Sequence, residues 1–490
     1  MTEQTEKSDP EIGFFVAVLT YYSYAVLIFF GHLRDFVGKI TGWSRYQDEK
    51  PKPGFAVLLK SWESFYTRRL YHRIQDCWGR PINSAPGAHI HVMERETKDN
   101  NCTLAVTGTS KTCLNLGSYN YLGFADDWKK TCSKEVYDAL EKWPNSMCSA
   151  TMDLGSIGIH EELENTVAKF VGKEAAIVYN MGYNTNTSTL AALMGEGTLI
   201  ISDSLNHTSI VNGARASKAQ IRVFRNNDAE HLDEVLRDAI IYGQPRTNRP
   251  WTKILVVVEG IYSMEGAICR LKDIVRVAKK YKAYMYVDEA HSIGALGKTG
   301  RGVCEYAGVD PEDIDILMGT FTKSFSGMGG YISGSKKTIA YVRSISEGIL
   351  YHNSMSPIVS QQILTALRVI MGADGTMYGQ EKITALISNS NFFRSEMERL
   401  GLHVYGDADS PIIPIMIYFP AKIAAFSREC LARGLAVVVV GFPATSVILS
   451  RVRFCISAGH TRADLEAAVK IIDEVTTLLC MKYKRSLLGL

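Results

Sequence analysis

Four sets of residues that could take part in chemistry each follow a short apolar run of the kind that forms a buried strand. They are Gly182 with Tyr183, His207, Asp288, and Lys323. Ligands of open α/β sheets bind beyond the carboxyl ends of the strands, so we expect these residues to gather at one edge. A lysine, aspartate, histidine or glycine alone at such a place has an ordinary structural explanation. All four together are informative, because one cofactor needs them all.

That cofactor is pyridoxal phosphate (PLP). Lys323, within the segment GTFTKSFSGMGG, can carry the aldehyde as a Schiff base and later move protons. Asp288 can keep the pyridine nitrogen protonated, so that the ring accepts electrons, and His207 can stack on that ring. Backbone N–H groups at Gly182 and Tyr183, before an apolar helix, can cradle the phosphate. We therefore interpret the chain as a PLP enzyme.

A helicase is the competing interpretation of one segment. Asp288–His291 reads Asp-Glu-Ala-His, which in helicases binds magnesium beside a phosphate loop of the pattern Gly-x4-Gly-Lys-Ser/Thr located upstream. The nearest candidate loop, Gly297–Thr299, lies downstream and has Ser292 where the first glycine belongs. The net charge of +3 over 490 residues, without a long basic run, also argues against nucleic acid as a partner.

The amino-acid composition limits which class of protein the chain can belong to. Hydrophobic residues make up 46% and charged residues 21%, as in an ordinary globular protein. The ten cysteines include no Cys-x-x-Cys pair, so neither a metal site nor a disulfide framework is indicated. A chain of 490 residues is long enough for two or three subdomains.

The elements that must position the four sets follow an α/β pattern. From about residue 150 to about 375, apolar runs alternate with amphipathic segments, which predicts a mostly parallel sheet covered by helices. The runs expected as strands are Ala175–Tyr179, Leu199–Ser202, Ile221–Phe224, Ile254–Val258, Ala283–Val287 and Ile314–Met318. One connecting segment, Leu271–Tyr281, has the spacing of an amphipathic helix. A second alternation beyond about residue 380 predicts a smaller α/β domain.

We expect four parts along the chain. Residues 1–50 form a membrane anchor with its flank, and residues 51–150 form an N-terminal arm. Residues 151–375 form the large PLP-binding domain, and residues 376–490 form the small C-terminal domain.

The N-terminal run Ile12–Gly31 contains no charged residue. Twenty helical residues span roughly 30 Å, the thickness of a bilayer core. An acidic stretch precedes the run, so a cleaved signal peptide fits poorly. Arg34, Lys39 and Arg45 follow the run, which predicts that the large C-terminal part faces the cytosol. Tyrosines in the middle of the run leave open a helix that lies in the membrane plane or packs on a partner.

Several motifs resemble those of the α-oxoamine synthases, a family of fold-type-I PLP-dependent transferases with an aspartate aminotransferase-like fold. The resemblance runs from about Leu114 to the C-terminus and is greatest to the lysine-bearing, long-chain-base subunits of that family. It is carried by Asn120–Gly123, Glu259–Gly266, Gly319–Phe325, Gly329–Ile332 and Arg453–Ser457. The resemblance implies a large domain with a mostly parallel sheet, a smaller C-terminal α/β domain and an N-terminal membrane helix.

The resemblance also implies a role for each site residue. Lys323 holds PLP and acts as acid and base, Asp288 pairs with the pyridinium nitrogen, and His207 stacks on the ring. His291 and Ser263 make hydrogen bonds near the ring's phenolic oxygen or the substrate.

Two further binding roles follow from the same resemblance. The backbone of Gly182 and Tyr183, with the Thr320 hydroxyl, holds the phosphate. Arg453 receives the amino-acid carboxylate with Asn120 as helper, since a planar guanidinium suits a carboxylate. Arg451 lies on the same face of the expected strand, so the sequence leaves it as an alternative.

The implied reaction is the decarboxylating condensation of L-serine with a long-chain acyl-CoA, palmitoyl-CoA, to give 3-ketosphinganine. The implied setting is the endoplasmic reticulum membrane with the catalytic domain facing the cytosol. The implied partners are a related lysine-free subunit, in a heterodimer, and small regulatory membrane subunits. Two alternatives stay open: a sister reaction with glycine or alanine and another acyl-CoA, and a non-catalytic scaffold subunit.

The chain departs from the family pattern at two places. Ser149–Asp153 lacks an arginine that relatives carry nearby, and Ser326 replaces a glycine just past Lys323. A glycine that needed positive φ would not be replaced freely. His160 is interpreted as a structural residue at the start of a helix.

Overall fold

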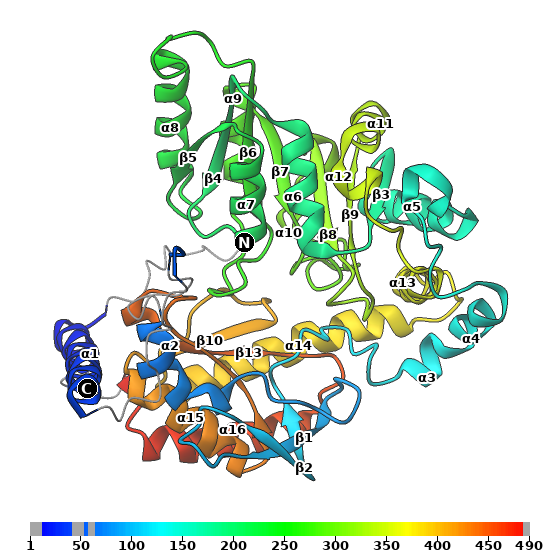
Figure 1. The fold of residues 1–490 in the computed structure, drawn as a ribbon. Coiled ribbons are helices and arrows are strands. Elements are labelled where there is room, and N and C mark those ends of the chain that lie inside the picture. Colours follow the sequence, from blue (N-terminus) through cyan, green and yellow to red (C-terminus); the bar gives the residue numbers. More distant parts are fainter. Residues whose placement is uncertain (1–11, 42–52, 57–63, 484–490) are drawn as a thin grey trace.

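The computed structural model describes residues 12–41, 53–56 and 64–483. Figure 1 shows two packed units, a large sheet with its helices and a C-terminal unit that also takes in the N-terminal segment. The acidic residues before the apolar run, and Arg45 after it, lie outside the described residues.

The large sheet has the strand order β3-β9-β8-β7-β6-β4-β5. Its strands are β3 (Ala175–Tyr179), β4 (Thr198–Asp203), β5 (Gln220–Phe224), β6 (Lys253–Glu259), β7 (Tyr284–Asp288), β8 (Ile316–Thr320) and β9 (Gly330–Gly334). Each of the six apolar runs expected as strands overlaps one of these strands, although β7 begins one residue later and β8 two residues later than expected. β9 is antiparallel to both neighbours, and the pairs from β5 through β8 are parallel. The carboxyl ends of β3, β4, β6, β7 and β8 therefore share one edge.

Helices cover both faces of this sheet, because its strands are apolar on both sides. Val256 and Val258 of β6 join one hydrophobic core, and Leu255 and Val257 join the other. The first core includes α5 (Gly158–Val171), α8 (Ala229–Tyr242), α9 (Leu271–Lys280), α10 (Val303–Ala307) and α13 (Pro357–Ile370). The second includes α6 (Gly182–Leu193), α7 (Thr208–Ala216), α11 (Lys336–Ile345) and α12 (Glu347–Leu350).

The C-terminal unit has a core of its own around two small sheets. One sheet has the order β10-β13-β12 and is antiparallel, and the other has the order β1-β2-β11. The strands are β1 (His89–Glu96), β2 (Ala105–Asn115), β10 (Ile412–Met416), β11 (Leu435–Ala436), β12 (Val438–Val440) and β13 (Arg451–Cys455). Its helices are α14 (Tyr378–Arg399), α15 (Pro420–Ala432) and α16 (Arg462–Leu478), while α3 (Trp128–Thr131) and α4 (Ser133–Lys142) pack on α13.

The segment expected as an N-terminal arm contains a hairpin, β1 with β2, that the sequence reading did not predict. Ile90 and Val92 are buried while His89 and His91 are exposed, which is the two-residue period of a strand with one covered face. β2 continues into the C-terminal unit, where Leu114 pairs with Leu435 of β11. This long-range pairing makes the β1–β2 hairpin part of the C-terminal unit.

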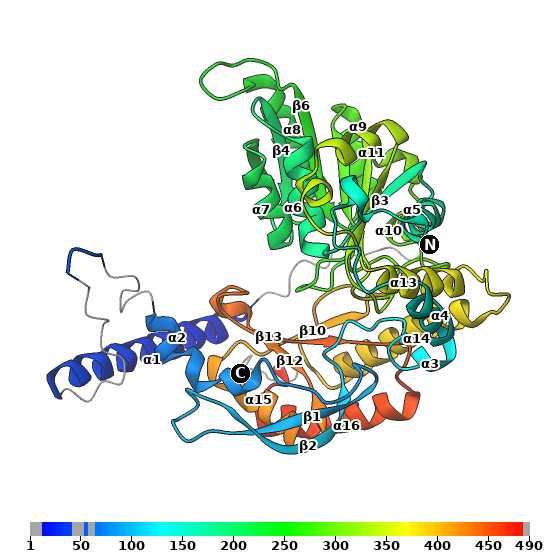
Figure 2. The same ribbon diagram turned by 45° about the vertical axis from the view of Figure 1, so that its right-hand side comes forward.

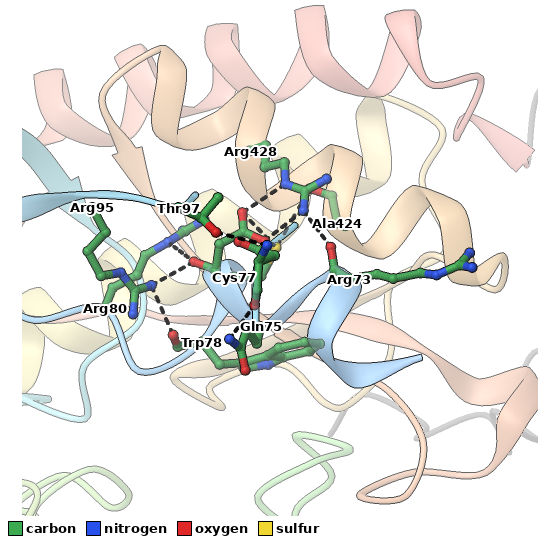
Figure 3. A network of polar contacts seen from close by, with 11 residues as sticks. Arg73, Gln75, Cys77, Trp78, Arg80, Arg95, Thr97, Ala424 and Arg428 are labelled. Atoms are coloured by element: carbon green, nitrogen blue, oxygen red, sulfur yellow. Dashed lines mark hydrogen bonds and ion pairs between the residues drawn. The ribbon is translucent and has the colours of Figure 1, made fainter. Parts of the chain in front are cut away.

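A polar network fixes the start of this segment to α15 (Figure 3). Asp76 accepts hydrogen bonds from Arg428 Nε at 2.8 Å and from Asn101 Nδ2 at 2.6 Å. The same guanidinium donates to the Arg73 carbonyl at 2.9 Å, and Arg95 donates to the Asp76 and Trp78 carbonyls. The contacts of Arg428 join residues more than 350 positions apart in the chain.

Helix α1 (Phe14–Thr41) extends from the C-terminal unit with α2 (Phe65–Arg69) at its side (Figure 2). Val16, Thr20 and Gly31 form a buried stripe, whereas Phe14 and Phe29 are mostly exposed. Within the described residues, Phe14–Gly38 is the one helix long and apolar enough to cross a membrane, by length and composition.

Candidate functional site

Asp288 and Glu259 end neighbouring strands and lie opposite each other in the register of β6 and β7. Asp288 accepts hydrogen bonds from the Ala290 N–H at 2.8 Å and from Asn186 Nδ2 at 2.7 Å. Glu259 accepts the His207 backbone N–H. Burial, and then the charge of Asp288, raise the pKa of Glu259 well above its usual range. Burial and the neighbouring carboxylate thus disfavour a second negative charge beside Asp288.

Lys323 lies in the loop between β8 and β9, three residues past the end of β8. Its Nζ is 5.7 Å from the centre of the Tyr119 ring. Burial lowers the pKa of Lys323 to about 8, although the charge of Asp288 opposes this shift. A lysine that is partly neutral near physiological pH can act as a nucleophile or a base.

The start of α6 forms the expected anion seat. Gly182 is the first helical residue, and a Cβ there would lie 2.6 Å from Thr320 Oγ1. Thr320 Oγ1 donates to the Gly329 carbonyl at 2.9 Å, and the Tyr183 ring meets the His207 ring edge-on at 6.1 Å. Unpaired N–H groups and the helix dipole attract anions at such a place. The structure thus brings Gly182, Tyr183 and Thr320 together.

Two arginines on β13 have different surroundings. Arg451 pairs with Glu265 at 3.1 Å and donates to the Met264 and Leu449 carbonyls. Arg453 is also buried, but within the described residues it has no carboxylate partner, and its Nε has no hydrogen-bond acceptor. The Arg453 guanidinium lies 4.8 Å from the centre of the Tyr119 ring. Arg453 is therefore the arginine left available for a ligand.

His291 lies in the same group. Its Nδ1 is 2.8 Å from the Tyr121 hydroxyl, and its ring is 5.3 Å from the Tyr119 ring. Burial lowers the pKa of His291 well below its usual range, and the charges of Lys323 and Arg453 act in the same direction. His291 is thus a neutral imidazole.

Asn120 and Ser263 are expected to bind the substrate or the cofactor. The Asn120 amide donates to Asp126 at 2.9 Å, and its carbonyl oxygen accepts the Ala125 N–H at 3.3 Å. Its amide is therefore already engaged, and the role of a carboxylate helper stays a prediction. Ser263 is half-buried, and its role near the ring or the substrate stays a prediction.

Ser326 and the segment Ser149–Asp153, which differ from the family pattern, have defined surroundings in the structure. Ser326 has a φ of 50°, so a serine occupies a left-handed position next to Lys323. The segment Ser149–Asp153 is tied to the opposite loop, where the Ser354 N–H donates to the Ser149 carbonyl. His160 accepts the Ile157 N–H at the start of α5 and bonds the Met355 carbonyl at 2.7 Å, which is a structural role.

Sequence reasoning missed Tyr119 and Asn186 as members of this site. Tyr119 lies among Lys323, His291 and Arg453, and it directly precedes the motif residue Asn120. Asn186 follows Gly182 by four residues, which places it on the same face of α6. That spacing was the available signal for Asn186.

Comparison with known proteins decides the family. The chain matches the family described as aminotransferase class I and II over residues 111–472. Long chain base biosynthesis protein 2b of Arabidopsis thaliana is 55% identical over 472 residues, which cover 96% of each chain. Serine palmitoyltransferase 2 of Dictyostelium discoideum is 50% identical over 99% of this chain and 98% of its own. The chain belongs to the serine palmitoyltransferase family.

Solved serine palmitoyltransferases share the fold. Sphingomonas wittichii serine palmitoyltransferase has a TM-score of 0.75 and 28% identity, over 87% of this chain and 99% of its own. A structure described as SPT with PLP internal aldimine has a TM-score of 0.73 and 30% identity, over 83% and 94%. The fold class and the family expected from the motifs are confirmed.

PLP is the cofactor of this enzyme family, and the residues present fit it. A seat at Gly182 that a Cβ would fill, a buried lysine and an orphaned arginine Nε are features that a PLP-bound amino acid would use. The expectation of a PLP-dependent serine palmitoyltransferase-type acyltransferase therefore agrees with both the family and the site.

Proposed function

We propose that the chain is the lysine-bearing catalytic subunit of a serine C-palmitoyltransferase. It condenses L-serine with palmitoyl-CoA, with loss of CO2 and CoA, to give 3-ketosphinganine, the first step of sphingolipid synthesis. The observation that carries the proposal is the buried Arg453, without a carboxylate partner among the described residues, beside the lysine Lys323. The guanidinium donates to Met264 Sδ at 3.6 Å, and a buried guanidinium without a carboxylate is costly unless a ligand supplies the anion.

When bound, PLP supplies an electron sink that stabilises negative charge at the α-carbon of an amino acid. Lys323 Nζ removes the α-proton of serine and later returns a proton to that carbon. Arg453 binds the serine carboxylate and orients the α-carbon toward Lys323. Asp288 would accept a hydrogen bond from the protonated ring nitrogen, and His207 would stack on the ring.

The remaining site roles are part of the same proposal. The N–H groups of Gly182 and Tyr183, with the Thr320 hydroxyl, hold the cofactor phosphate. His291 and Ser263 act near the phenolic oxygen or the substrate, and Asn120 supports the carboxylate after its contact with Asp126 rearranges. The buried position of His291 beside Tyr121 supports its place in this group.

Partner and membrane assignments complete the proposal. We infer a heterodimer with the related lysine-free subunit, with small regulatory membrane subunits. Exposed apolar side chains near the anion seat support an interface, with Leu154 83%, Tyr351 75% and Met328 61% exposed. The exposed apolar face of α1 supports attachment to the endoplasmic reticulum membrane, with the catalytic units in the cytosol.

A product assay tests the proposal. The purified chain, with and without the lysine-free subunit, is given serine, alanine or glycine with acyl-CoAs of graded length. We expect 3-ketosphinganine from serine and palmitoyl-CoA, and no product from Lys323→Ala. Lys337→Ala, at an exposed lysine, is the matched control and retains activity.

Each contrary result has a distinct meaning. Turnover by Lys323→Ala would refute the catalytic role of Lys323. A product from alanine or glycine in place of serine would support the sister reaction, and a wild-type chain without PLP absorbance would support a scaffold subunit.

A further inference from the structure

Asn186 is the centre of a buried hydrogen-bond chain that joins Asp288 to His207, and the proposed reaction gives Asn186 itself no role. Its side chain is 1% exposed. Asn186 Oδ1 accepts the Tyr286 hydroxyl at 2.7 Å, and Nδ2 donates to Asp288 Oδ2 at 2.7 Å. Nδ2 also donates to Ser209 Oγ at 2.9 Å. The amide thus connects α6 with β7 and α7.

The direction of every bond in this chain is fixed by chemistry. A carboxylate only accepts hydrogen bonds, so the nitrogen of Asn186 must face Asp288 and its oxygen must face the Tyr286 hydroxyl. Ser209 Oγ accepts from Asn186, and a hydroxyl has one proton to donate. That proton points to His207 Nδ1, which lies 2.8 Å from Ser209 Oγ.

His207 Nδ1 is therefore an acceptor. It also accepts the backbone N–H of Ser209 at 3.2 Å, where His207 caps the start of α7. Two donors on one ring nitrogen exclude a proton from that nitrogen, so the proton of the neutral ring resides on Nε2.

We propose that Asn186 and Ser209 are positioning residues. Their hydrogen bonds connect Asp288 to His207 and hold the His207 ring as the neutral Nε2–H tautomer. The consequence for catalysis rests on the proposed function: a neutral ring against the cofactor adds no positive charge beside a protonated pyridine. The same bonds prevent the ring from rotating, and they leave Nε2–H as its donor.

The charged groups around His207 come from several elements. Asp288 of β7 would raise its pKa, and Lys323 of the β8–β9 loop would lower it. Glu259 of β6 accepts the His207 backbone N–H, and burial raises the pKa of Glu259 well above its usual range. Tyr183 of α6 meets the His207 ring edge-on. Burial is the largest influence and lowers the pKa of His207, in agreement with the bond directions.

The test measures the protonation of His207 in the protein without PLP. Hydrogen–deuterium exchange at the imidazole C2 position, followed by peptide mass spectrometry across a pH series, gives the titration midpoint of His207. We expect Ser209→Ala to raise this midpoint by about one unit, because one donor to the neutral ring is lost. Asn186→Ala frees the Ser209 hydroxyl to rotate, so it shifts the midpoint in the same direction.

Two controls separate this role from general loosening of the structure. Ser209→Thr restores the hydroxyl and is expected to keep the wild-type midpoint. Ser217→Ala removes a buried hydroxyl at the other end of α7, which bonds the Ala214 carbonyl, and is also expected to leave the midpoint unchanged. Should Asn186→Ala fail to fold, the two Ser209 variants still decide the question.

The contrary outcomes are equally specific. An unchanged midpoint in folded Ser209→Ala, or a wild-type His207 that is protonated at pH 7, would overturn the inference. Absence of PLP absorbance in the wild-type protein would instead count against the proposed function, since the exchange measurement needs no cofactor.

Discussion

Arg451 and Arg453 lie two residues apart on β13, yet within the described residues only Arg451 has a carboxylate partner, Glu265 at 3.1 Å. Both side chains are buried. The difference separates a structural ion pair from a guanidinium that awaits an anion, which the sequence alone left open.

Arg453→Ala is expected to lower kcat/KM for serine by about 100-fold or more, because a charge-assisted bond to the carboxylate is lost. The effect should be mostly in KM, with PLP absorbance retained. Arg451→Ala should instead lower the melting temperature, since the ion pair with Glu265 and the hydrogen bonds to the Met264 and Leu449 carbonyls are lost. Steady-state kinetics and thermal unfolding of both variants test these two expectations. A larger loss of kcat/KM in Arg451→Ala than in Arg453→Ala would assign the serine carboxylate to Arg451.

The capture of PLP by the apoprotein should depend on pH through Lys323. The pKa of Lys323 is lowered to about 8 by burial, and the neutral amine is the nucleophile. The capture rate should therefore rise about tenfold per pH unit below pH 8 and level off above it. Stopped-flow absorbance measures the rate. An inflection near the ordinary lysine value of about 10.4 would contradict the buried environment.

Gly182→Ala is expected to weaken PLP binding by about tenfold or more. The added Cβ would lie 2.6 Å from Thr320 Oγ1 and would displace that hydroxyl from the anion seat. Gly195→Ala is the matched control, because a Cβ there meets nothing within 4 Å. Equilibrium dialysis with PLP compares the two variants, and equal affinities would remove Gly182 from the cradle.

Ser326→Gly is expected to stabilise the fold by about 0.5–1 kcal/mol, because a left-handed serine is strained and glycine is not. The φ of Ser326 is 50°. Ser335→Gly, at a φ of −66° and an N-cap position of α11, should destabilise the protein instead. Chemical denaturation of the two variants measures the difference. A destabilised Ser326→Gly would show that the hydroxyl has a role beside Lys323.

Asp76→Asn is expected to weaken the attachment of the N-terminal segment to α15 and to lower the free energy of unfolding by about 1 kcal/mol. Partial burial alone would raise the pKa of Asp76, but hydrogen bonds from Arg428 and Asn101 lower it overall. A lowered folded pKa gives stability above the unfolded value of about 3.9, and this stability is lost as the pH falls through the folded value. Denaturation at neutral pH should separate the variant from the wild type, and the difference should vanish in acid.

The sequence by itself determined six of the seven strands of the large sheet and the functional residues that follow them. Apolar runs buried on both faces leave a clear signal, and Asp288, His207, Gly182 and Lys323 follow those runs directly. The shared edge then follows from parallel pairing. The family motifs added the expected fold and chemistry.

The tertiary structure decided which polar groups are already paired. Asn120 is engaged by Asp126, and Arg451 is engaged by Glu265. Arg453 instead lies over the Tyr119 ring, which Lys323 also approaches. It also placed Asn186 between Asp288 and Ser209, and it inserted β9 antiparallel between β3 and β8. These pairings and the position of β9 depend on packing between segments far apart in the chain. Local residue patterns do not specify which partner each side chain contacts.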